Sequence, residues 1–374
     1  QLLEAFLRGG MLDRPRYTLW IELALLLFAA GLVIAVVPAM RPLFSPLAYV
    51  SALIGLVVGT WIAFDHFQIL LDPSFPIVGT GLIYSVMLTA TRSAVERARK
   101  RLAGELEDER RVVAHHEGEL SAARDIQLGI LPRNFQLFSD RHEFTIHAYL
   151  EPARAVGGDL YDFDLVDDHH LFFAVGDVSG KGVPASLFMA ITKALCKSNA
   201  LRGPETIDVI INRANGEIAR ENPAMLFVTM LAGLLDLRSG ELQICNAGHD
   251  APFRLRAGRA PELLEGEGGP PLCALDDYEY PLDKFQLAPG DGLVIFTDGV
   301  TEAQNSAQEL YGTERLTRIL SELPDGTDSE TIVTTLTADI HRFEDGAVQF
   351  DDTTIMAIRY MGPGAPAGTS GGTQ

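Results

Sequence analysis

The stretch VGDVSGKG at residues 175–182 ends an apolar run with an aspartate, Asp177, and continues into a glycine-rich turn. The apolar run, from 171 to 178, predicts a buried β-strand. A strand that leads directly into a carboxylate is costly unless the acid is solvated, capped or bound to a cation. Glycine beside the acid allows main chain and water to approach closely. The stretch therefore predicts either an N-terminal cap for a following helix or part of a cation site.

Three more segments place acids in similar surroundings: GGDLYD at 157–162, FTDGV at 296–300 and FDDTT at 350–354. We expect their aspartates, Asp159, Asp298 and Asp351, to lie at the ends of strands. Each segment alone is as consistent with an ordinary turn. All four together, in this order and with glycine beside several of them, are far more specific. Carboxylates without His or Cys partners favour Mg²⁺ or Mn²⁺ over zinc.

Short β-rich runs and helical patterns alternate around these segments. Strands are predicted at 144–150, 171–178, 227–237, 242–246 and 293–297. Helices are predicted at 183–200, 206–220 and 328–343, the last with Asp328 as its N-cap. Strands adjoin strands and helices cluster, which indicates a layered α+β domain.

Composition sets wider limits. The chain has 374 residues, with 30 basic and 50 acidic side chains and a net charge of -20. A chain this acidic is repelled by nucleic acid, which argues against a nucleic-acid partner. Cys196, Cys245 and Cys273 are far apart, and predict reduced thiols in a cytoplasmic domain. The chain begins at Gln1 without Met, so we expect a further segment before it.

A nearly uncharged region precedes the charged part of the chain. Three apolar stretches lie in it: 19–37, 47–64 and 69–90. About 20 apolar residues cross a bilayer as a helix, and the first two stretches come close to that length. The third contains Asp72, Pro73 and Pro76, so it spans fully only if its helix begins near Phe75 or enters irregularly. A hairpin of core helices is the alternative, which the scarcity of charges besides Glu22 disfavours.

Basic residues predict the orientation of these spans. Arg92 and the basic residues at 97–101 follow the third stretch directly, which places that end in the cytoplasm. The loop with Arg41 then also lies inside. The N-terminal flank falls outside despite its arginines, a conflict that a large translocated domain before Gln1 would explain. We expect a multi-pass protein of the inner or plasma membrane with a cytoplasmic C-terminal domain.

Residues 92–132 are rich in charge and lack proline before Pro132, which predicts a helical linker. A heptad-like seam runs along it: Leu102, Leu106, Val113, Leu120, Ala123, Gln127 and Ile130, with Glu109 and His116 in the same stripe. The seam favours a coiled-coil homodimer. A solvated single helix is the alternative.

The four acidic segments together resemble the SpoIIE family of bacterial serine phosphatases, a branch of the metal-dependent (PPM-type) protein phosphatases. The resemblance covers about residues 120–360 and includes ARDIQ at 123–127, LP at 131–132 and NAGH at 246–249. It implies an α-β-β-α sandwich of two antiparallel sheets between helical layers. It also implies hydrolysis of phosphoserine or phosphothreonine on a regulatory protein of the anti-sigma-factor antagonist type, by water activated between two metal ions.

The resemblance assigns roles to the acids. Asp177 corresponds to the acid that bridges two Mn²⁺ or Mg²⁺ ions, and the carbonyl of Val178 to a further ligand. Asp298 and Asp351 correspond to ligands of the second ion. Asp159 corresponds to an acid that contacts the cluster mainly through water. Asp177 and Asp298 are the expected catalytic pair.

Four other residues rank lower. Asp352 occupies a position that is Asn in many relatives. Lys181 is a candidate to neutralise the phosphate, although a cap contact or a surface charge is slightly favoured, and Arg154 is a candidate phosphate anchor. His249 follows a glycine in an expected hairpin turn, where support of the turn is favoured over protonation of the leaving group.

Residues 1–90 resemble the end of a CHASE type-2 sensor with its three membrane helices. The predicted organisation is a sensor end, three spans, a linker, a phosphatase domain and a disordered tail: 1–17, 18–91, 92–132, 133–361 and 362–374. The expected function is that of a membrane-anchored phosphatase that responds to an extracellular signal. The presence of all four acids disfavours a degenerate binding module, and a membrane-bound cyclase would need a nucleotide site that the sequence does not show.

Overall fold

The computed structural model describes residues 15–40, 44–67, 69–133, 135–138, 140–220 and 222–364. The chain divides into two compact units, Gln1–His115 and His116–Gln374, and each is described by itself. The sensor end predicted at 1–17 and the disordered tail predicted at 362–374 fall almost entirely outside the described residues. The other predicted domain limits stay predictions.

The first unit contains helices α2 (Thr18–Val36), α3 (Ser45–Phe67) and the beginning of α4 (Ser74–Ile130), with a short 3₁₀ turn η1 (Val37–Ala39) after α2. All three helices are long and apolar enough to cross a membrane. Glu22 is buried in α2, and its Oε1 accepts a hydrogen bond of 2.8 Å from the main-chain N–H of Asp72. This contact gives the one acid of the first span a polar partner within the protein.

The third helix begins later than the apolar stretch at 69–90. Residues 69–73 are not helical, because proline restricts the residue before it and lacks an N–H. The side chain of Asp72 then accepts a hydrogen bond of 2.9 Å from the N–H of Ser74, at the start of the helix. The helix therefore begins at Ser74, close to the start near Phe75 that the sequence required for a complete span.

Helix α4 runs without a break from the third apolar stretch through the predicted linker. Leu102, Leu106 and Val113 of the predicted seam are exposed along it. Gln127 differs, because only 5% of its surface is exposed and its side chain bonds to the main chain of Gly157. The seam prediction is therefore wrong at Gln127, which contacts the domain that follows. Dimerisation through the rest of the seam stays a prediction.

The second unit contains two antiparallel five-stranded sheets. After the 3₁₀ turn η2 (Phe135–Phe138), sheet A has the order β1-β10-β9-β6-β7 and sheet B the order β2-β3-β4-β5-β8. The strands of sheet A are β1 (Phe144–Glu151), β10 (Thr353–Tyr360), β9 (Gly292–Phe296), β6 (Phe253–Leu255) and β7 (Glu262–Leu263). Those of sheet B are β2 (Leu160–Leu165), β3 (His170–Val178), β4 (Val228–Asp236), β5 (Glu241–Ala247) and β8 (Asp283–Gln286).

Strand residues alternate between two apolar layers, as the period of two requires. On β3, Leu171, Phe173 and Val175 join the core between the sheets, while Phe172 and Ala174 join the core beneath the helices of sheet B. On β9 and β10 the same alternation fills the layer between the sheets and the one beneath the helices of sheet A. The two sheets therefore pack face to face.

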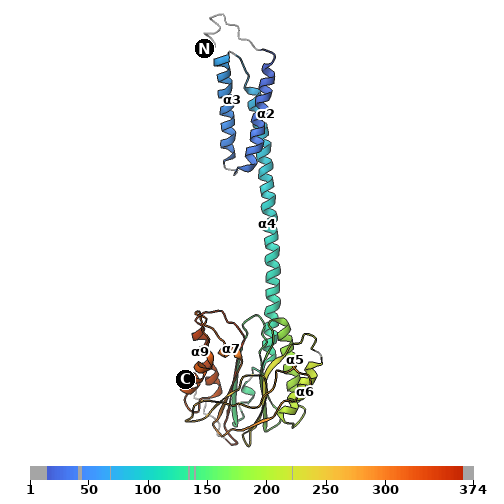
Figure 1. Cartoon of the computed structure of the whole chain (residues 1–374), viewed down its shortest axis with the longest axis vertical. Helices are drawn as coiled ribbons and strands as arrows, with labels where there is room; N and C mark the ends of the chain where they lie inside the picture. Colours follow the sequence, from blue (N-terminus) through green and yellow to red (C-terminus); the bar gives the residue numbers. More distant parts are fainter. Residues whose placement is uncertain are drawn as a thin grey trace. The chain divides into compact units, whose positions relative to one another are not determined.

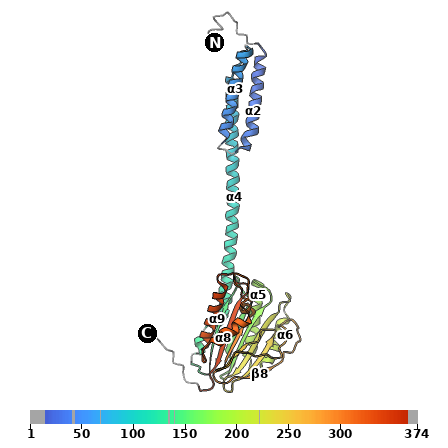
Figure 2. The same cartoon turned by 60° about the vertical axis from the view of Figure 1, so that its left-hand side comes forward.

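Helices cover the outer face of each sheet (Figure 1). Helices α5 (Val183–Ala200) and α6 (Ile207–Ala219) pack on sheet B, and α9 (Ser329–Glu344) packs on β1 and β10 of sheet A. Helices α7 (Asp298–Thr301) and α8 (Gly312–Glu322) complete the layer over sheet A, where α8 lies beside α9 (Figure 2). The predicted α-β-β-α sandwich is confirmed.

The predicted strands and helices appear within two residues of their expected limits, and the side chain of Asp328 accepts from the N–H of Thr331 as the N-cap of α9. Among the elements that were not predicted are β2 and β10, the helix α8, and the short elements β6, β7, β8 and α7. The first two begin directly after Asp159 and Asp352, so these acids stand before strands.

Candidate metal centre

The four acidic segments meet because the strands that carry them are antiparallel. Asp177 is the penultimate residue of β3, and Asp298 begins α7 just after β9. Asp159 precedes β2, and Asp351 lies shortly before β10, so the expectation of four strand ends is wrong for these two. In an antiparallel pair, the start of one strand lies beside the end of its neighbour. Acids before one strand and acids after the other therefore lie at the same end of the sheet.

The pairing register places each acid of one sheet beside another. Leu160 of β2 pairs with Gly176 of β3, which sets Asp159 next to Asp177. Ile355 of β10 pairs with Phe296 of β9, which sets the segment of Asp351 next to that of Asp298. Each sheet thus contributes one pair of acids.

Gly158 keeps an opening beside Asp177. A Cβ at this position would lie 2.8 Å from the carbonyl oxygen of Val178 and 3.0 Å from Oδ1 of Asp177. Both distances are too short for an ordinary side chain. The glycine therefore leaves room next to two oxygens that were predicted to bind a metal ion, the Asp177 carboxylate and the Val178 carbonyl.

Asp159 is the most buried of the four acids. Its Oδ2 accepts hydrogen bonds from the hydroxyls of Thr297 at 2.8 Å and of Thr354 at 2.5 Å. Its Oδ1 is buried and receives no hydrogen bond from any residue that the structure describes. A buried carboxylate oxygen without a donor is costly, and a cation or an ordered water would satisfy it.

Thr297 and Thr354 are functional candidates that the sequence reasoning missed. They stand directly before Asp298 and two residues after Asp352, inside the FTDGV and FDDTT segments. Both are fully buried. The available signal was a threonine close to an acid in each of two segments. Only the tertiary structure shows that both hydroxyls reach Asp159.

Burial and the charges of neighbouring acids raise the pKa of Asp159, Asp177 and Asp298. Burial, followed by the charges of Asp177 and Asp352, raises the pKa of Asp159 well above its usual value. Burial, followed by the charge of Asp298, raises the pKa of Asp177 to about 7. Asp298 retains solvent contact, and its pKa is raised by partial burial and then by Glu302 and Asp351. Negative charge is thus concentrated in a partly desolvated place, which favours a bound cation.

Within the described ranges, no three His, Cys, Asp or Glu side chains are gathered into a complete set of ligands. Carboxylates repel one another, so closely packed ligands need the cation itself to hold them. The residues nevertheless fit hard divalent cations, because every contributing group is an oxygen. The donorless Oδ1 of Asp159 and the opening at Gly158 support the same fit.

Asp352 serves the loop that carries Asp159. Its Oδ1 accepts from the N–H of Ala153 at 2.8 Å, and its Oδ2 accepts from the N–H of Gly158 at 2.6 Å. A Cβ on Gly157 would overlap this carboxylate. With both oxygens committed to main-chain donors, Asp352 is better suited to holding the loop than to binding an ion.

The structure supports a turn role for His249. The side chain of Asn246 bonds to both the N–H and the carbonyl of His249, at 2.8 and 2.9 Å. The imidazole is buried, and burial lowers its pKa to about 4. A neutral imidazole at pH 7 is a poor proton donor.

Arg154 is exposed, and its carbonyl accepts from Arg124 at 3.2 Å.

Gln127 connects α4 to the loop of Asp159. Its Nε2 donates to the carbonyl of Gly157 at 2.7 Å, and its Oε1 accepts from the N–H of Gly157 at 3.1 Å. One amide thus satisfies both main-chain groups of a residue two positions before Asp159. Gln127 was assigned to the coiled-coil seam, although it also ends the ARDIQ motif at 123–127 that belongs to the family resemblance.

Substitution of Gln127 by alanine should lower the free energy of unfolding of this domain by about 2 kcal/mol, since two buried main-chain groups lose their partners. Urea denaturation followed by circular dichroism would measure the change. Arg124→Ala, which removes an exposed contact to the same loop, should cost less than about 1 kcal/mol. Equal losses in both variants would show that the buried amide has no special role.

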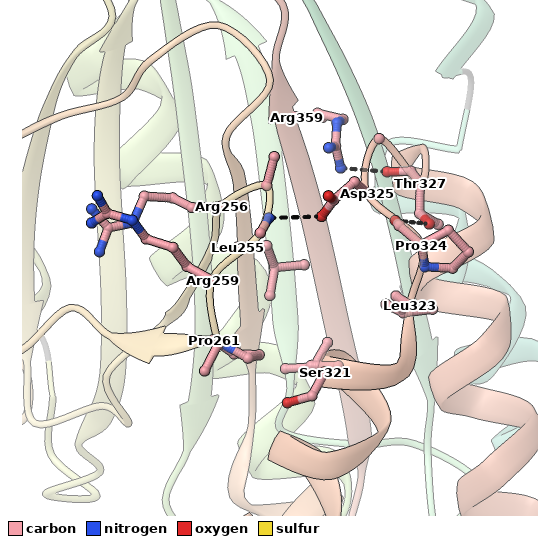
Figure 3. Close-up of a pocket in the computed structure, with 15 residues that line it drawn as sticks. Leu255, Arg256, Arg259, Pro261, Ser321, Leu323, Pro324, Asp325, Thr327 and Arg359 are labelled. Carbon is pink, nitrogen blue, oxygen red and sulfur yellow. Dashed lines mark hydrogen bonds between the residues drawn. The ribbon is translucent and has the colours of Figure 1, made fainter.

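A cavity of about 350 Å³ lies elsewhere in the domain, between the β6–β7 turn and the connection from α8 to α9 (Figure 3). Asp325 accepts from the N–H of Gly258, and Arg359 donates to the carbonyl of Thr327 at 2.6 Å. Arg359 pairs with Gly292, at the end of β9 opposite to Phe296 and Asp298. The cavity is therefore separate from the acids.

Comparison with known proteins decides the family. The family model described as Stage II sporulation protein E (SpoIIE) matches residues 167–361, more than half of the chain. This chain belongs to the SpoIIE family. The matched region contains Asp177, Asp298 and Asp351, whereas Asp159 lies just before it.

Three proteins illustrate what this chain is similar to. Protein IcfG of Synechocystis is 30% identical over 266 residues, 64% of this chain and 41% of that protein. Phosphoserine phosphatase RsbU of Bacillus subtilis is 29% identical over 189 residues, 50% of this chain and 55% of RsbU. The chain thus spans about half the length of the curated relatives it matches. The SiaA-PP2C domain of Pseudomonas aeruginosa has the same fold, with a TM-score of 0.56 at 23% identity, over 67% of this chain and 98% of that domain.

Proposed function

We propose that the SpoIIE-type domain is a metal-dependent protein serine/threonine phosphatase that acts on a phosphorylated regulatory protein. The observation that carries the proposal is the meeting of Asp159, Asp177, Asp298 and Asp351 at neighbouring strand termini, with raised pKa values for the first three. A cluster of this kind suits two hard cations rather than a purely structural ion pair.

The family resemblance gives each acid a role, which its position in the structure allows. Asp177, beside the opening at Gly158, would hold both ions, with the Val178 carbonyl as a further ligand. Asp298 and Asp351 would hold the second ion, and Asp159 would support the cluster from its buried side. Bound Mn²⁺ or Mg²⁺ would supply an activated water and charge neutralisation at the phosphoryl oxygens.

The protein part of the site contributes orientation and access. Thr297 and Thr354 fix one oxygen of Asp159, and Asp352 fixes the loop before it. Asp298 retains solvent contact, so a phosphoserine on the surface of another protein can approach from this side. Since no nucleophilic side chain is needed, we propose direct hydrolysis without a covalent intermediate.

The substrate class is proposed from a relative. RsbU, which is 29% identical, is a phosphoserine phosphatase by name. We therefore propose a phosphoserine protein of the anti-sigma-factor antagonist type as the substrate of this chain. The acidic net charge of -20 argues against a nucleic-acid partner.

We further propose that the chain is a multi-pass protein of the inner or plasma membrane with the phosphatase domain in the cytoplasm. The three apolar helices support the anchoring, and the basic residues after the third support the orientation. A CHASE type-2 sensor before Gln1 would receive the extracellular signal, and the exposed seam of α4 would form a homodimer. These parts of the proposal rest on the sequence.

A phosphoserine peptide should be hydrolysed by the purified chain in the presence of Mn²⁺, and removal of the metal by EDTA should abolish turnover reversibly. Asp298→Asn should lower turnover by about 10²-fold, because it removes a charged ligand of the second ion. Phosphate release measured against Mn²⁺ concentration gives both numbers.

Asp345→Asn is the matched control. Asp345 adopts a left-handed conformation at the C-cap of α9, which Asn tolerates well, so this variant should keep wild-type turnover. Metal-independent turnover, or equal turnover by Asp298→Asn and the wild-type chain, would contradict the proposed function.

A further inference from the structure

The loop between β3 and α5 holds a lysine at a fixed place beside the acids. Gly180 and Gly182 on either side of Lys181 have positive φ values, +89° and +83°. Such values are easy for glycine and strained for other residues. Ser179 anchors the loop, since its N–H donates to the carbonyl of Phe227 at 2.8 Å and its hydroxyl accepts from the N–H of Phe227 at 2.9 Å. The turn that follows Asp177 thus has a defined course.

The ammonium group of Lys181 lies on the segment that carries Asp351. Its Nζ is 2.8 Å from Oδ2 of Asp351 and donates to the carbonyl of Phe350 at 3.1 Å. The same atom lies 4.7 Å from the ring centroid of Phe350, a distance at which a cation is attracted to an aromatic face. Three contacts therefore hold one positive charge at a single acid of the cluster.

This ion pair lies near the surface and is only partly shielded from solvent. The side chains of Lys181 and Asp351 are 35% and 29% exposed, so water and salt screen their attraction only in part. In contrast, one carboxylate oxygen of Asp159 accepts from two neutral hydroxyls. Among the four acids, and within the described part of the chain, Asp351 is the one whose carboxylate forms an ion pair with a lysine or arginine.

We propose that the Lys181 ammonium competes with a divalent cation for Asp351 and so sets the affinity of the metal position that this acid serves. The inference rests on the proposed function, since it takes Asp351 as a metal ligand. A divalent cation on Asp351 would meet a like charge a few ångströms away, so the lysine must leave the carboxylate as the ion binds. Lys181 is a positioning residue for this site, and its flexible side chain allows the exchange.

The test is a titration of the full chain in detergent with Mn²⁺ alone, followed by electron paramagnetic resonance of the free ion. Lys181→Gln keeps the length and a hydrogen-bond donor but removes the charge. Its weaker Mn²⁺ site should tighten by about tenfold, because a partly buried like charge beside a cation is removed. Lys181→Arg keeps the charge and should bind Mn²⁺ about as the wild-type chain does.

Lys284→Gln is the matched control for the loss of a lysine. The Lys284–Glu241 ion pair has an N–O distance of 2.9 Å, close to that of the Lys181–Asp351 pair. Glu241 begins β5, whereas the other end of β5, at Ala247, pairs with Met230 close to the acids. The control pair is therefore distant from the acids. This variant should leave the Mn²⁺ affinity unchanged. An equal gain in Lys284→Gln would reduce the effect to net charge and overturn the proposal.

A double-mutant comparison shows whether the gain passes through Asp351. In an Asp351→Asn background, Lys181→Gln should give no gain in Mn²⁺ affinity. A gain that persists there, or an unchanged or weaker affinity in Lys181→Gln alone, would overturn the competition. An unchanged or weaker Mn²⁺ affinity in Lys181→Gln, together with a raised KM for phosphoserine peptide, would indicate that Lys181 binds the substrate phosphate instead. A wild-type chain that binds no Mn²⁺ would instead overturn the proposed function itself.

Discussion

Substitution of Asp177 by asparagine is expected to lower the turnover of a phosphoserine peptide by about 10³-fold or more, a loss of about 4 kcal/mol of transition-state stabilisation. Asparagine keeps the shape of the side chain but not its charge. Asp177 lies beside the opening at Gly158. Burial, followed by the charge of Asp298, raises the pKa of Asp177 to about 7. Removing this carboxylate would affect both proposed ions.

Phosphate release at saturating Mn²⁺ would measure the effect, together with Mn²⁺ binding to the same preparation. Asp276→Asn, an exposed aspartate in the loop before β8, should keep wild-type activity. If the Asp177→Asn chain turns over at the wild-type rate, the assignment of the bridging acid is wrong. Lost turnover with intact Mn²⁺ affinity would instead separate catalysis from metal binding.

Gly299→Ala is expected to destabilise the domain by about 3 kcal/mol, at the upper end of what an added methyl costs in a packed interior. A Cβ on Gly299 would overlap the main-chain oxygen of Asp352. The obstacle is the backbone directly before β10, so no side-chain rotation can relieve it. In a domain of this size the melting temperature should fall by about 10 °C, and the loops of Asp298 and Asp351 should move apart.

Differential scanning calorimetry of the full chain would measure the shift, since both tryptophans, Trp20 and Trp61, lie in α2 and α3 and do not report on this domain. Gly216→Ala is the matched control, because Gly216 lies in α6 with open space around its Cβ position. Alanine there should be neutral or stabilising by up to about 1 kcal/mol. A Gly299→Ala domain that melts like the control would show that the two loops are not packed as described.

Much of the architecture was predictable because local patterns and tertiary structure agree. The continuous apolar runs on β3 and β9 predict strands that are buried on both faces, and their two faces do lie in separate apolar cores. Asp328 predicts the start of α9, where its side chain accepts from Thr331. The apolar stretches predict three helices, because a span of about 20 apolar residues depends only on length and composition.

Other elements were missed where polar residues interrupt the pattern. Strand β2 contains Asp162 and Asp164, whose charges hide its alternation, and the structure explains them by ion pairs with Lys193 and Lys197 at 2.9 and 2.7 Å. Helix α8 buries only Leu316 and Leu320 and is otherwise largely polar. In both cases the stabilising partners come from distant sequence.

The stretch VGDVSGKG and its three companion segments were enough to determine the family resemblance and to name the candidate acids, and the strand and helix patterns around them predicted the layered fold. The chain order of these segments could not show which oxygens are already committed. Only the tertiary structure places Asp352 on the main chain of Gly158, Gln127 on Gly157 and Lys181 on Asp351. These contacts join residues 30 to 194 positions apart, and hydrogen bonds and ion pairs at such separations leave no periodic signal along the chain.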